Sequence, residues 1–199
     1  MTSTNGTRLY LIRHGETPRQ GYCNGHLDVS LTSAGVTEME AVAQRVQPEG
    51  IAALYASDLG RAVQSAEIIG RALNRKPIIS QMLREKCFGK WEGLPQTELE
   101  ARFPTEWQEW ITNPADAKPT EGESCREMAA RVLPDIARIV KRHVGERVAI
   151  VAHGGVNRVI LCDALGLDLH YMERIAQRHA ALNIIEFYEG SAVVQLVNG

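Results

Sequence analysis

The sequence lacks the features that mark membrane-spanning, secreted and nucleic-acid-binding proteins. No apolar run among the 199 residues reaches the roughly 18 that a membrane helix needs. The opening segment MTSTNGTR has no apolar stretch of the kind found in a secretory signal. Basic residues are scattered and the formal net charge is −2, which gives no positive patch for nucleic acid. We therefore expect a cytoplasmic protein that binds neither membrane nor nucleic acid.

Cysteine is also sparse, and its spacing excludes the common cysteine motifs. Cys23, Cys87, Cys125 and Cys162 stand alone, with no CxxC pair and no histidine at zinc-ligand spacing. Isolated cysteines are typical of free thiols in a reducing compartment. The sequence therefore predicts four free thiols and no metal site built on them.

The rest of the composition is that of an ordinary globular protein. The chain is 44% hydrophobic and 23% charged, and its length suits one α/β domain over residues 1–199. Short apolar runs predict buried strands, and apolar residues at helical spacing predict helices. The predicted strands lie at 9–12, 51–57, 77–80, 147–155, 181–189 and 192–197, with a turn at Glu189–Gly190 between the last two. The predicted helices lie at 31–46, 58–73, 126–144 and 156–166.

Caps and breakers refine three of these helices. Thr32 is the expected N-cap of the first helix, and Val36 begins its apolar face. Ser57 or Asp58 is the expected N-cap of the second helix. In the third, Pro134 is expected to kink the helix or to start its second half.

The alternation of strands and helices indicates the fold class. It predicts a mainly parallel sheet with helices on both faces, and a site at the carboxyl edge of the strands. Only residues 81–125 interrupt the alternation. This segment holds all three tryptophans and four of the eight prolines, and is too aromatic for a disordered linker. We interpret it as an excursion that covers the edge of the sheet.

Two predicted strands end in the same arrangement of residues. LYLIRHG and VAIVAHGG each place a histidine, His14 or His153, between an apolar run and a glycine. If the two strands are neighbours in a parallel sheet, the two histidines emerge side by side. The glycines allow a sharp turn and the close approach of a ligand. One such histidine alone is more often structural, but two at matched strand ends favour a site.

Two arginines point to the same edge. Arg13 precedes His14, and Arg61 lies in the first turn of the helix that follows the second strand. Helix N-termini favour anions, and guanidinium groups match the oxygens of a phosphate. Alone, Arg61 could equally be an exposed residue of the first helical turn. Together with the two histidines, the arginines predict a phosphate site.

At this point the sequence resembles the histidine phosphatase superfamily, in its phosphoglycerate-mutase-like branch. The blocks LIRHGET, SDLGRAVQSAE, LREKCFGKWEG, GES and VAHGG occur in the family's order, between about residues 8 and 188. The resemblance implies a three-layer α/β fold and a reaction that needs no metal or cofactor. It implies that His14 is the nucleophile that accepts the phosphoryl group, and that Glu85 protonates the leaving oxygen. Arg13, Arg61 and His153 would hold the phosphoryl oxygens.

The resemblance also suggests further phosphate contacts. Thr17, Gln20 and Gly154 are expected among them. Gln20 stands where the family usually has asparagine, and its amide would reach the phosphate from one methylene further away. Asn157 replaces a residue that is commonly apolar, and its role is left open. Of the other histidines, His26 is a candidate for lining the pocket, whereas His143, His170 and His179 are expected to be surface or structural.

The proton donor needs a carboxylic acid that keeps its proton near neutral pH. Phe88 and Trp91 follow Glu85 closely in the sequence, so we expect their rings to desolvate the carboxyl group and raise its pKa.

The function that these residues favour is a phosphomonoesterase acting on small phosphorylated metabolites. The compact chain, FGKWEG after Glu85 and the run NPADAKPTEGES resemble the α-ribazole phosphatase and broad-specificity phosphatase group. A cofactor-dependent phosphoglycerate mutase is the alternative, and a non-catalytic phosphate-binding or scaffold protein is a weaker one. The sequence identifies neither the physiological substrate nor the oligomeric state, and a homodimer is left open.

Overall fold

The apolar run near the start of the chain forms a central strand of the sheet. In the computed structural model, which describes residues 5–199, β1 (Thr7–Arg13) pairs in parallel with β4 (Arg147–Ala152) and antiparallel with β5 (Leu182–Tyr188). The other strands are β2 (Ala53–Ala56), β3 (Ile78–Ile79) and β6 (Ser191–Leu196). Their order is β3-β2-β4-β1-β5-β6, and only β5 and β6 run antiparallel to their neighbours. The prediction of a mainly parallel sheet is confirmed.

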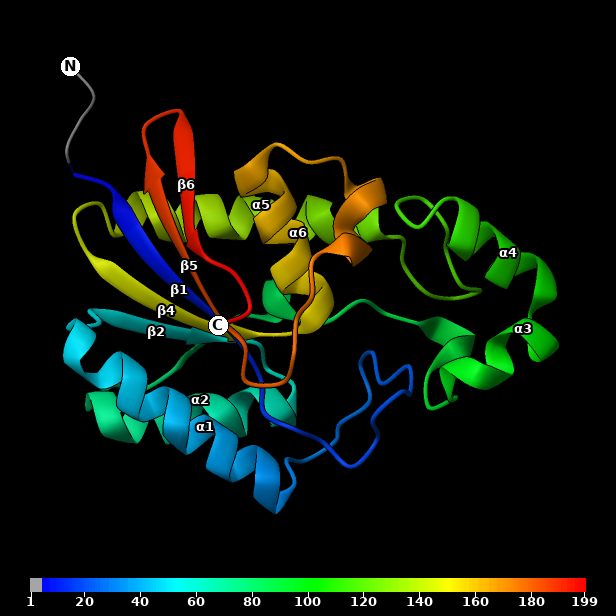
Figure 1. Ribbon diagram of the computed structural model, residues 1–199, viewed down its shortest axis with the longest axis horizontal. Helices are drawn as coiled ribbons and strands as arrows, with labels where there is room; N and C mark the ends of the chain where they lie inside the picture. Colours follow the sequence, from blue (N-terminus) through cyan, green and yellow to red (C-terminus); the bar gives the residue numbers. More distant parts are fainter. Residues whose placement is uncertain (1–4) are drawn as a thin grey trace.

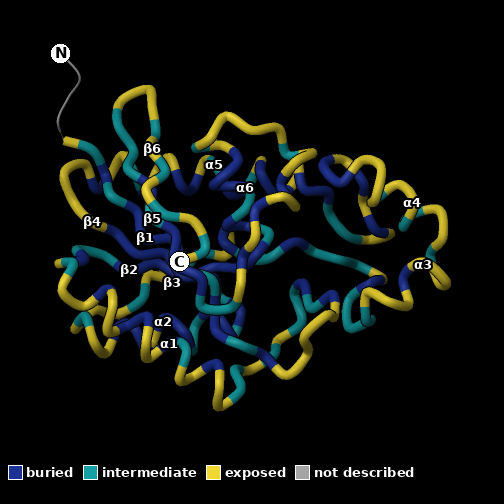
Figure 2. The backbone as a smooth tube through the Cα atoms, in the orientation of Figure 1, coloured by how far each residue is buried: buried dark blue, intermediate teal, exposed yellow. Residues whose placement is uncertain are grey.

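Alternate residues of β1 pack against opposite layers of helices. The covering helices are α1 (Ser33–Val46), α2 (Gly60–Leu73), α5 (Cys125–Arg142) and α6 (Gly154–Leu165). Leu9 and Leu11 join the core under α5 and α6, whereas Tyr10 and Ile12 join the core under α1 and α2. Side chains alternate between the two faces of a strand, so a continuous apolar run belongs in a sheet covered on both sides. Figure 1 shows the two helical layers, and Figure 2 shows the buried strands between them.

The first helix begins as predicted but turns one apolar residue outward. The Thr32 hydroxyl accepts a hydrogen bond from the Gly35 N–H at 3.0 Å, so Thr32 is the N-cap. Val36, expected on the buried face, is 37% exposed. The buried face consists of Gly35, Met39, Val42, Ala43 and Val46.

The predicted cap of the second helix is wrong. α2 begins after Leu59, which supplies no side-chain cap within the described chain, rather than after Ser57 or Asp58. Asp28, from the loop between β1 and α1, instead accepts a hydrogen bond from the Gly60 N–H at 2.9 Å. A carboxylate from a distant loop thus satisfies an N–H group of the first turn, where negative charge is favourable.

Pro134 lies inside one continuous helix and does not divide it. α5 starts with a capping box in which Ser124 and Glu127 exchange hydrogen bonds, and it runs to Arg142. Proline removes the bond to the carbonyl four residues earlier, here that of Ala130. Pro134 and Ala130 are both exposed, so the helix loses this bond on its solvent side, where water can replace it.

Residues 81–125 form the excursion that the sequence predicts. It lies on the side of the sheet toward which the parallel strands point (Figure 1). Trp91 is buried, and its ring centroid lies 5.5 Å from that of Trp110 and 6.3 Å from that of Trp107. The segment thus has a small aromatic core of its own. Its helical pieces are η2 (Gln81–Leu83), η3 (Gly89–Trp91), η4 (Gln96–Glu98), α3 (Leu99–Arg102) and α4 (Pro104–Thr112).

Two further short helices lie between the main elements: η1 (Gln47–Glu49) follows α1, and η5 (Leu169–Arg174) follows α6. The predicted turn at Glu189–Gly190 joins β5 to β6, and Gly190 has a φ of 76°, which favours glycine. Across residues 5–199, every helix is too short or too polar to cross a bilayer.

Candidate active site

The two strand-end histidines lie side by side. In the parallel register of β1 and β4, Arg13 is opposite Ala152, so the next residue of each strand carries its histidine to the same edge. The centroids of the His14 and His153 rings are 5.3 Å apart, and both side chains are buried. The juxtaposition predicted from the repeated motif is confirmed.

One hydrogen bond sets the tautomer of His14. Its Nδ1 lies 2.7 Å from the carbonyl oxygen of Gly15, which can only accept, so Nδ1 carries the proton. The lone pair is then on Nε2. Burial, reinforced by the charges of Arg13 and Arg61, holds the pKa of His14 well below its usual value of 6.5. The ring is therefore neutral and has a free nucleophilic nitrogen at neutral pH.

His153 lies beside His14 with both ring nitrogens free of hydrogen bonds to residues 5–199. Burial and the neighbouring Arg61 hold its pKa well below 6.5 as well. Buried polar atoms in proteins are normally paired. Two unpaired nitrogens beside the His14 ring therefore indicate a place for a ligand oxygen.

Arg61 is a buried cation and Arg13 a half-buried one, and both are held by backbone carbonyls rather than by carboxylates. Arg61 donates to the carbonyl oxygens of Gly25 at 2.7 Å and Leu27 at 2.9 Å, and Arg13 donates to that of Gln177 at 2.6 Å. Burial lowers the pKa of Arg13 to about 10, which leaves it charged at neutral pH. Neither guanidinium has a carboxylate within 4 Å in the described structure. Two fixed cations without a counter-ion make the site attractive to an anion.

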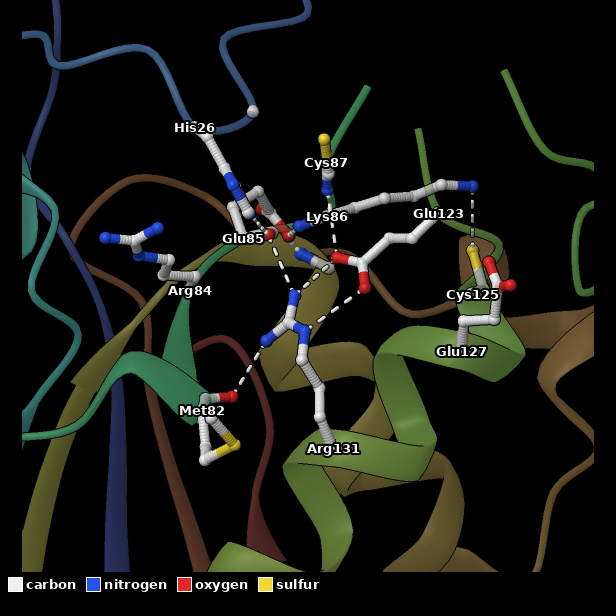
Figure 3. A network of polar contacts seen from close by, with 12 residues as sticks. His26, Met82, Arg84, Glu85, Lys86, Cys87, Glu123, Cys125, Glu127 and Arg131 are labelled. Carbon is white, nitrogen blue, oxygen red and sulfur yellow. Dashed lines mark hydrogen bonds and ion pairs between the residues drawn. The ribbon is translucent and has the colours of Figure 1, made fainter. Parts of the chain in front are cut away.

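Glu85 faces the same cavity and is held from two sides. Its Oε2 accepts a hydrogen bond from the N–H of Gly155, in the first turn of α6, at 3.0 Å, and its Oε1 accepts one from the N–H of Lys86 at 2.9 Å. Its backbone carbonyl oxygen accepts a hydrogen bond from Arg131 of α5 and lies 2.9 Å from Nε2 of His26. Figure 3 shows this anchoring of the Glu85 main chain.

Phe88 and Trp91 were expected to pack around the Glu85 carboxyl group and desolvate it, and the structure shows this arrangement only in part. Phe88 and Trp91 line the same cavity as Glu85. Trp91, however, packs against Trp107 and Trp110, and the hydrogen-bond partners of the Glu85 carboxylate are backbone N–H groups.

The cavity has a volume of about 560 Å³ and brings the predicted residues together. Its lining includes seven of the eight residues expected in the site, namely Arg13, His14, Thr17, Gln20, Arg61, Glu85 and Gly154. The eighth, His153, is fully buried beside the His14 ring and is not part of the lining. Gln20 is directed to another partner, because its Nε2 donates to Glu16 Oε2 at 2.6 Å. In this arrangement its amide is bound to a carboxylate, and a phosphate contact would require it to turn.

Asn157 lies under the site rather than in the cavity. Its side chain is fully buried and contacts Gln177 and the backbone of His153 and Arg13. Gln177 in turn bonds to Asn183 of β5. This buried amide network anchors the strand end that carries Arg13 and His14.

One of the remaining histidines was misjudged from the sequence. His179 was expected to be surface or structural, yet its ring lies 5.6 Å from that of His14 and its Nε2 is 3.1 Å from Arg13. Burial and the charge of Arg13 lower its pKa to about 4. His143 is structural, since it is buried between Tyr55 and Glu146, and His170 is exposed beside Tyr171. His26 contacts the Glu85 main chain but is not part of the cavity lining.

Lys86 is one of the cavity residues that the sequence did not predict. It is only 2% exposed, and its ammonium lies 3.9 Å from the centroid of the Trp110 ring. Its position directly after Glu85 in the motif LREKCFG was the available signal. The four cysteines are free thiols, and in the described chain no group of three or more histidine, cysteine or acidic side chains could hold a metal ion.

Known proteins resemble this chain in sequence and in fold. The family described as the histidine phosphatase superfamily (branch 1) matches residues 9–199. Probable phosphoglycerate mutase GpmB of Yersinia pestis is 32% identical over 187 residues, covering 92% of this chain and 86% of that protein. The solved mycobacterial glucosyl-3-phosphoglycerate phosphatase is 26% identical with a TM-score of 0.89, covering 98% of this chain and 99% of that one. Further structures of that enzyme hold VO3 and inorganic phosphate. The α-ribazole phosphatase of Shigella flexneri is 26% identical with a TM-score of 0.87, covering 96% of each chain. The chain described here belongs to the histidine phosphatase superfamily.

Proposed function

We propose that the protein is a phosphomonoesterase that hydrolyses small phosphorylated metabolites through a phosphohistidine on His14, with Glu85 as the proton donor. The observation that carries the proposal is the pair of guanidinium groups, fixed by backbone carbonyls, beside a neutral histidine whose Nε2 is free. This combination provides a nucleophile and positive charge for the phosphoryl oxygens, which are the main requirements of phosphoryl transfer.

In the first step, Nε2 of His14 forms a bond to phosphorus while the bond from phosphorus to the ester oxygen breaks. Glu85, in its carboxylic acid form, gives its proton to that oxygen, and the leaving group departs as an alcohol. The Nδ1 proton stays on the ring, and the Gly15 carbonyl stabilises the positive charge that develops there. Arg13, Arg61 and His153 hold the phosphoryl oxygens.

In the second step, the Glu85 carboxylate takes a proton from a water molecule whose oxygen bonds to phosphorus. The bond between phosphorus and Nε2 breaks, its electron pair returns to the ring, and inorganic phosphate leaves. His14 is again neutral and Glu85 again carries its proton, so the cycle closes without a metal or an organic cofactor.

The aromatic side chains of residues 81–125 support the proposal that the leaving group is a small organic molecule. Phe88, Trp91, Trp107 and Trp110 line the cavity on the side of residues 81–125. Such a wall excludes water from the first step and contacts the leaving group. The mycobacterial relative crystallised with inorganic phosphate and VO3 supports phosphate binding in a cavity of this kind.

A phosphoglycerate mutase is the second candidate, favoured by the 32% identity to probable phosphoglycerate mutase GpmB. The two functions differ in what accepts the phosphoryl group from His14, water or a second hydroxyl of the substrate. A non-catalytic phosphate-binding protein is the weaker alternative, because every residue type that the reaction needs is present.

The test is a panel of phosphomonoesters assayed with EDTA present. It should contain p-nitrophenyl phosphate, 3-phosphoglycerate, phosphoserine, sugar phosphates and α-ribazole phosphate. We expect phosphate release that survives chelation and is inhibited competitively by vanadate. Loss of activity with EDTA that a divalent ion restores would contradict the metal-free mechanism. Formation of 2-phosphoglycerate from 3-phosphoglycerate and 2,3-bisphosphoglycerate without phosphate release would identify a mutase instead, and no turnover of any ester would favour the binding protein.

A further inference from the structure

His179 lines the cavity next to the strand end that carries the proposed nucleophile. Its Nε2 lies 3.1 Å from Nη2 of Arg13, and its ring centroid lies 5.6 Å from that of His14. A guanidinium group can only donate, so Nε2 accepts this hydrogen bond and Nδ1 carries the proton. Burial and the charge of Arg13, which lower the pKa of His179 to about 4, keep the imidazole neutral at neutral pH.

The segment that carries His179 is fixed to the end of β1. The N–H of Ala180 donates to the carbonyl oxygen of His14 at 3.0 Å, and the N–H of Arg13 donates to that of Ala181 at 3.0 Å. These two bonds lie directly after His179 in the sequence. The imidazole is therefore held at a defined place beside Arg13.

The guanidinium group of Arg13 has two acceptors within residues 5–199, and both are uncharged. Nη1 donates to the carbonyl oxygen of Gln177 at 2.6 Å, and Nη2 donates to His179. Its Nε is buried and has no acceptor in the described chain. A β-carbon on Gly154 would lie 3.6 Å from this Nε, so the donor lies against the first turn of α6. Buried donors are normally paired, and the unpaired Nε indicates a place for a ligand oxygen.

The neutrality of His179 matters for the charge of Arg13. A carboxylate at this position would accept the same hydrogen bond, but it would also form an ion pair with the guanidinium. The positive charge would then be partly compensated before a phosphoryl group arrived. A neutral imidazole fixes the guanidinium and leaves its charge available to the phosphoryl oxygens.

We propose that His179 is a positioning residue, which fixes the Arg13 guanidinium through a neutral hydrogen bond and thereby directs its charge at the phosphoryl group. The proposal rests on the proposed phosphatase function and adds a residue to its machinery. His179 acts through Arg13 and forms no bond to the phosphoryl group itself.

Three variants of His179 test this role. His179→Ala removes the acceptor, and kcat/KM for p-nitrophenyl phosphate should fall by roughly tenfold to a hundredfold, as for a group displaced by about 1 Å. His179→Gln and His179→Glu are a matched pair, because both side chains carry an oxygen that can accept from Arg13 and only the second is charged. His179→Gln should recover most of the loss, and His179→Glu should not.

Two results of this comparison would overturn the proposal. One is wild-type activity of His179→Ala, and the other is equal activity of His179→Gln and His179→Glu. Circular dichroism checks the fold of each variant. If His179→Ala does not fold, the matched pair decides the question, since both of its members keep an acceptor.

A double-variant cycle with Arg13→Ala shows whether His179 acts through Arg13. The readout is the binding of inorganic phosphate, measured by calorimetry, which needs no turnover. His179→Ala alone should weaken this binding by roughly twofold to tenfold, as for a lost hydrogen bond. In the Arg13→Ala background it should have no effect. An equal loss in that background would make His179 a direct contact of the phosphate and would refute the positioning role.

His170→Ala is the matched control. His170 is an exposed histidine outside the cavity lining, so its removal should change neither kcat/KM nor phosphate binding. Hydrolysis that is insensitive to His179 would leave the phosphatase function standing and reject the role of His179. Phosphate binding that depends on His179 through Arg13, in a protein without turnover, would keep that role and reject the phosphatase function.

Discussion

Because Gly155 has no side chain, the Glu85 carboxylate can lie directly against its backbone. Its N–H donates to Oε2 of Glu85 at 3.0 Å, and a β-carbon added at Gly155 would collide with Oε1. Because Oε1 is the far end of a flexible side chain, the collision would move the carboxylate rather than unfold the helix. The first turn of α6 and the proposed proton donor are thus fitted to each other.

Gly155→Ala should therefore impair proton donation while preserving the fold. We expect kcat for alkyl phosphates to fall roughly tenfold to a hundredfold, as for an acid displaced by about 1 Å. The free energy of unfolding should change by less than about 1 kcal/mol, because movement of the flexible Glu85 side chain relieves the clash. Wild-type activity of Gly155→Ala on alkyl phosphates would show that this glycine does not position Glu85.

The two strand-end histidines should have separable roles. His14→Ala should abolish turnover with the fold intact, since it removes the only proposed nucleophile. His153→Ala should keep the nucleophile but lose a contact to the phosphoryl oxygens, which would raise the barrier by ~3–4 kcal/mol if it acts like a preorganised donor. Steady-state rates and circular dichroism of both variants decide this. A His14→Ala enzyme with most of its activity would refute the assignment of the nucleophile.

The neutral histidines make stability sensitive to acid. In the unfolded chain each imidazole takes up a proton as the pH falls through about 6.5, whereas His14 and His153 stay neutral well below that value and His179 to about 4. Unfolding therefore binds protons below pH 6.5, and stability present above that pH is lost as the pH falls toward 4.

Replacing His179 isolates one part of this effect. Between pH 7.5 and pH 5, the free energy of unfolding of His179→Gln should fall by less than that of the wild type. The two losses should differ by at most ~2 kcal/mol. This is the full effect over the 1.5 pH units between about pH 6.5 and pH 5, at about 1.36 kcal/mol per pH unit, and the partial exposure of the ring reduces it. Denaturant titrations at the two pH values measure it. Identical losses in both proteins would mean that His179 is not held neutral by Arg13 and burial.

The parts of the site that depend on strand periodicity were predictable from the sequence. An apolar run covered on both faces, repeated before His14 and His153, determines both the sheet and the meeting of the two rings. The parts that depend on distant loops were not. Asp28 caps α2 from another loop, and His179 reaches Arg13 from an irregular segment before β5.

Lys86 illustrates the same limit for a charged side chain. Lysine is rarely buried, so nothing in its local sequence indicates that Trp110, Ala117 and Cys125 enclose it. The excursion was recognisable as a departure from strand–helix alternation, but its inward-facing residues depend on the aromatic packing of segments that are distant in sequence.

Glu85→Gln should separate the two chemical steps. If Glu85 donates a proton to the leaving oxygen, microscopic reversibility makes it the base that activates water in the second step. Glutamine can do neither. With an alkyl phosphate the first step should slow by roughly a hundredfold or more, the usual contribution of a general acid.

With p-nitrophenyl phosphate, whose leaving group needs little protonation, the first step should proceed in Glu85→Gln and the second should lag. Rapid mixing should then show a burst of p-nitrophenol, followed by slow turnover, and a phosphohistidine on His14 that is labile to acid and stable to base. The Glu85→Gln, His14→Ala double variant should give neither the burst nor the label. If Glu85→Gln instead slows the hydrolysis of p-nitrophenyl phosphate and of an alkyl phosphate equally, and no phosphoenzyme accumulates, Glu85 does not carry the proton. Its role would then be to position groups around the phosphate.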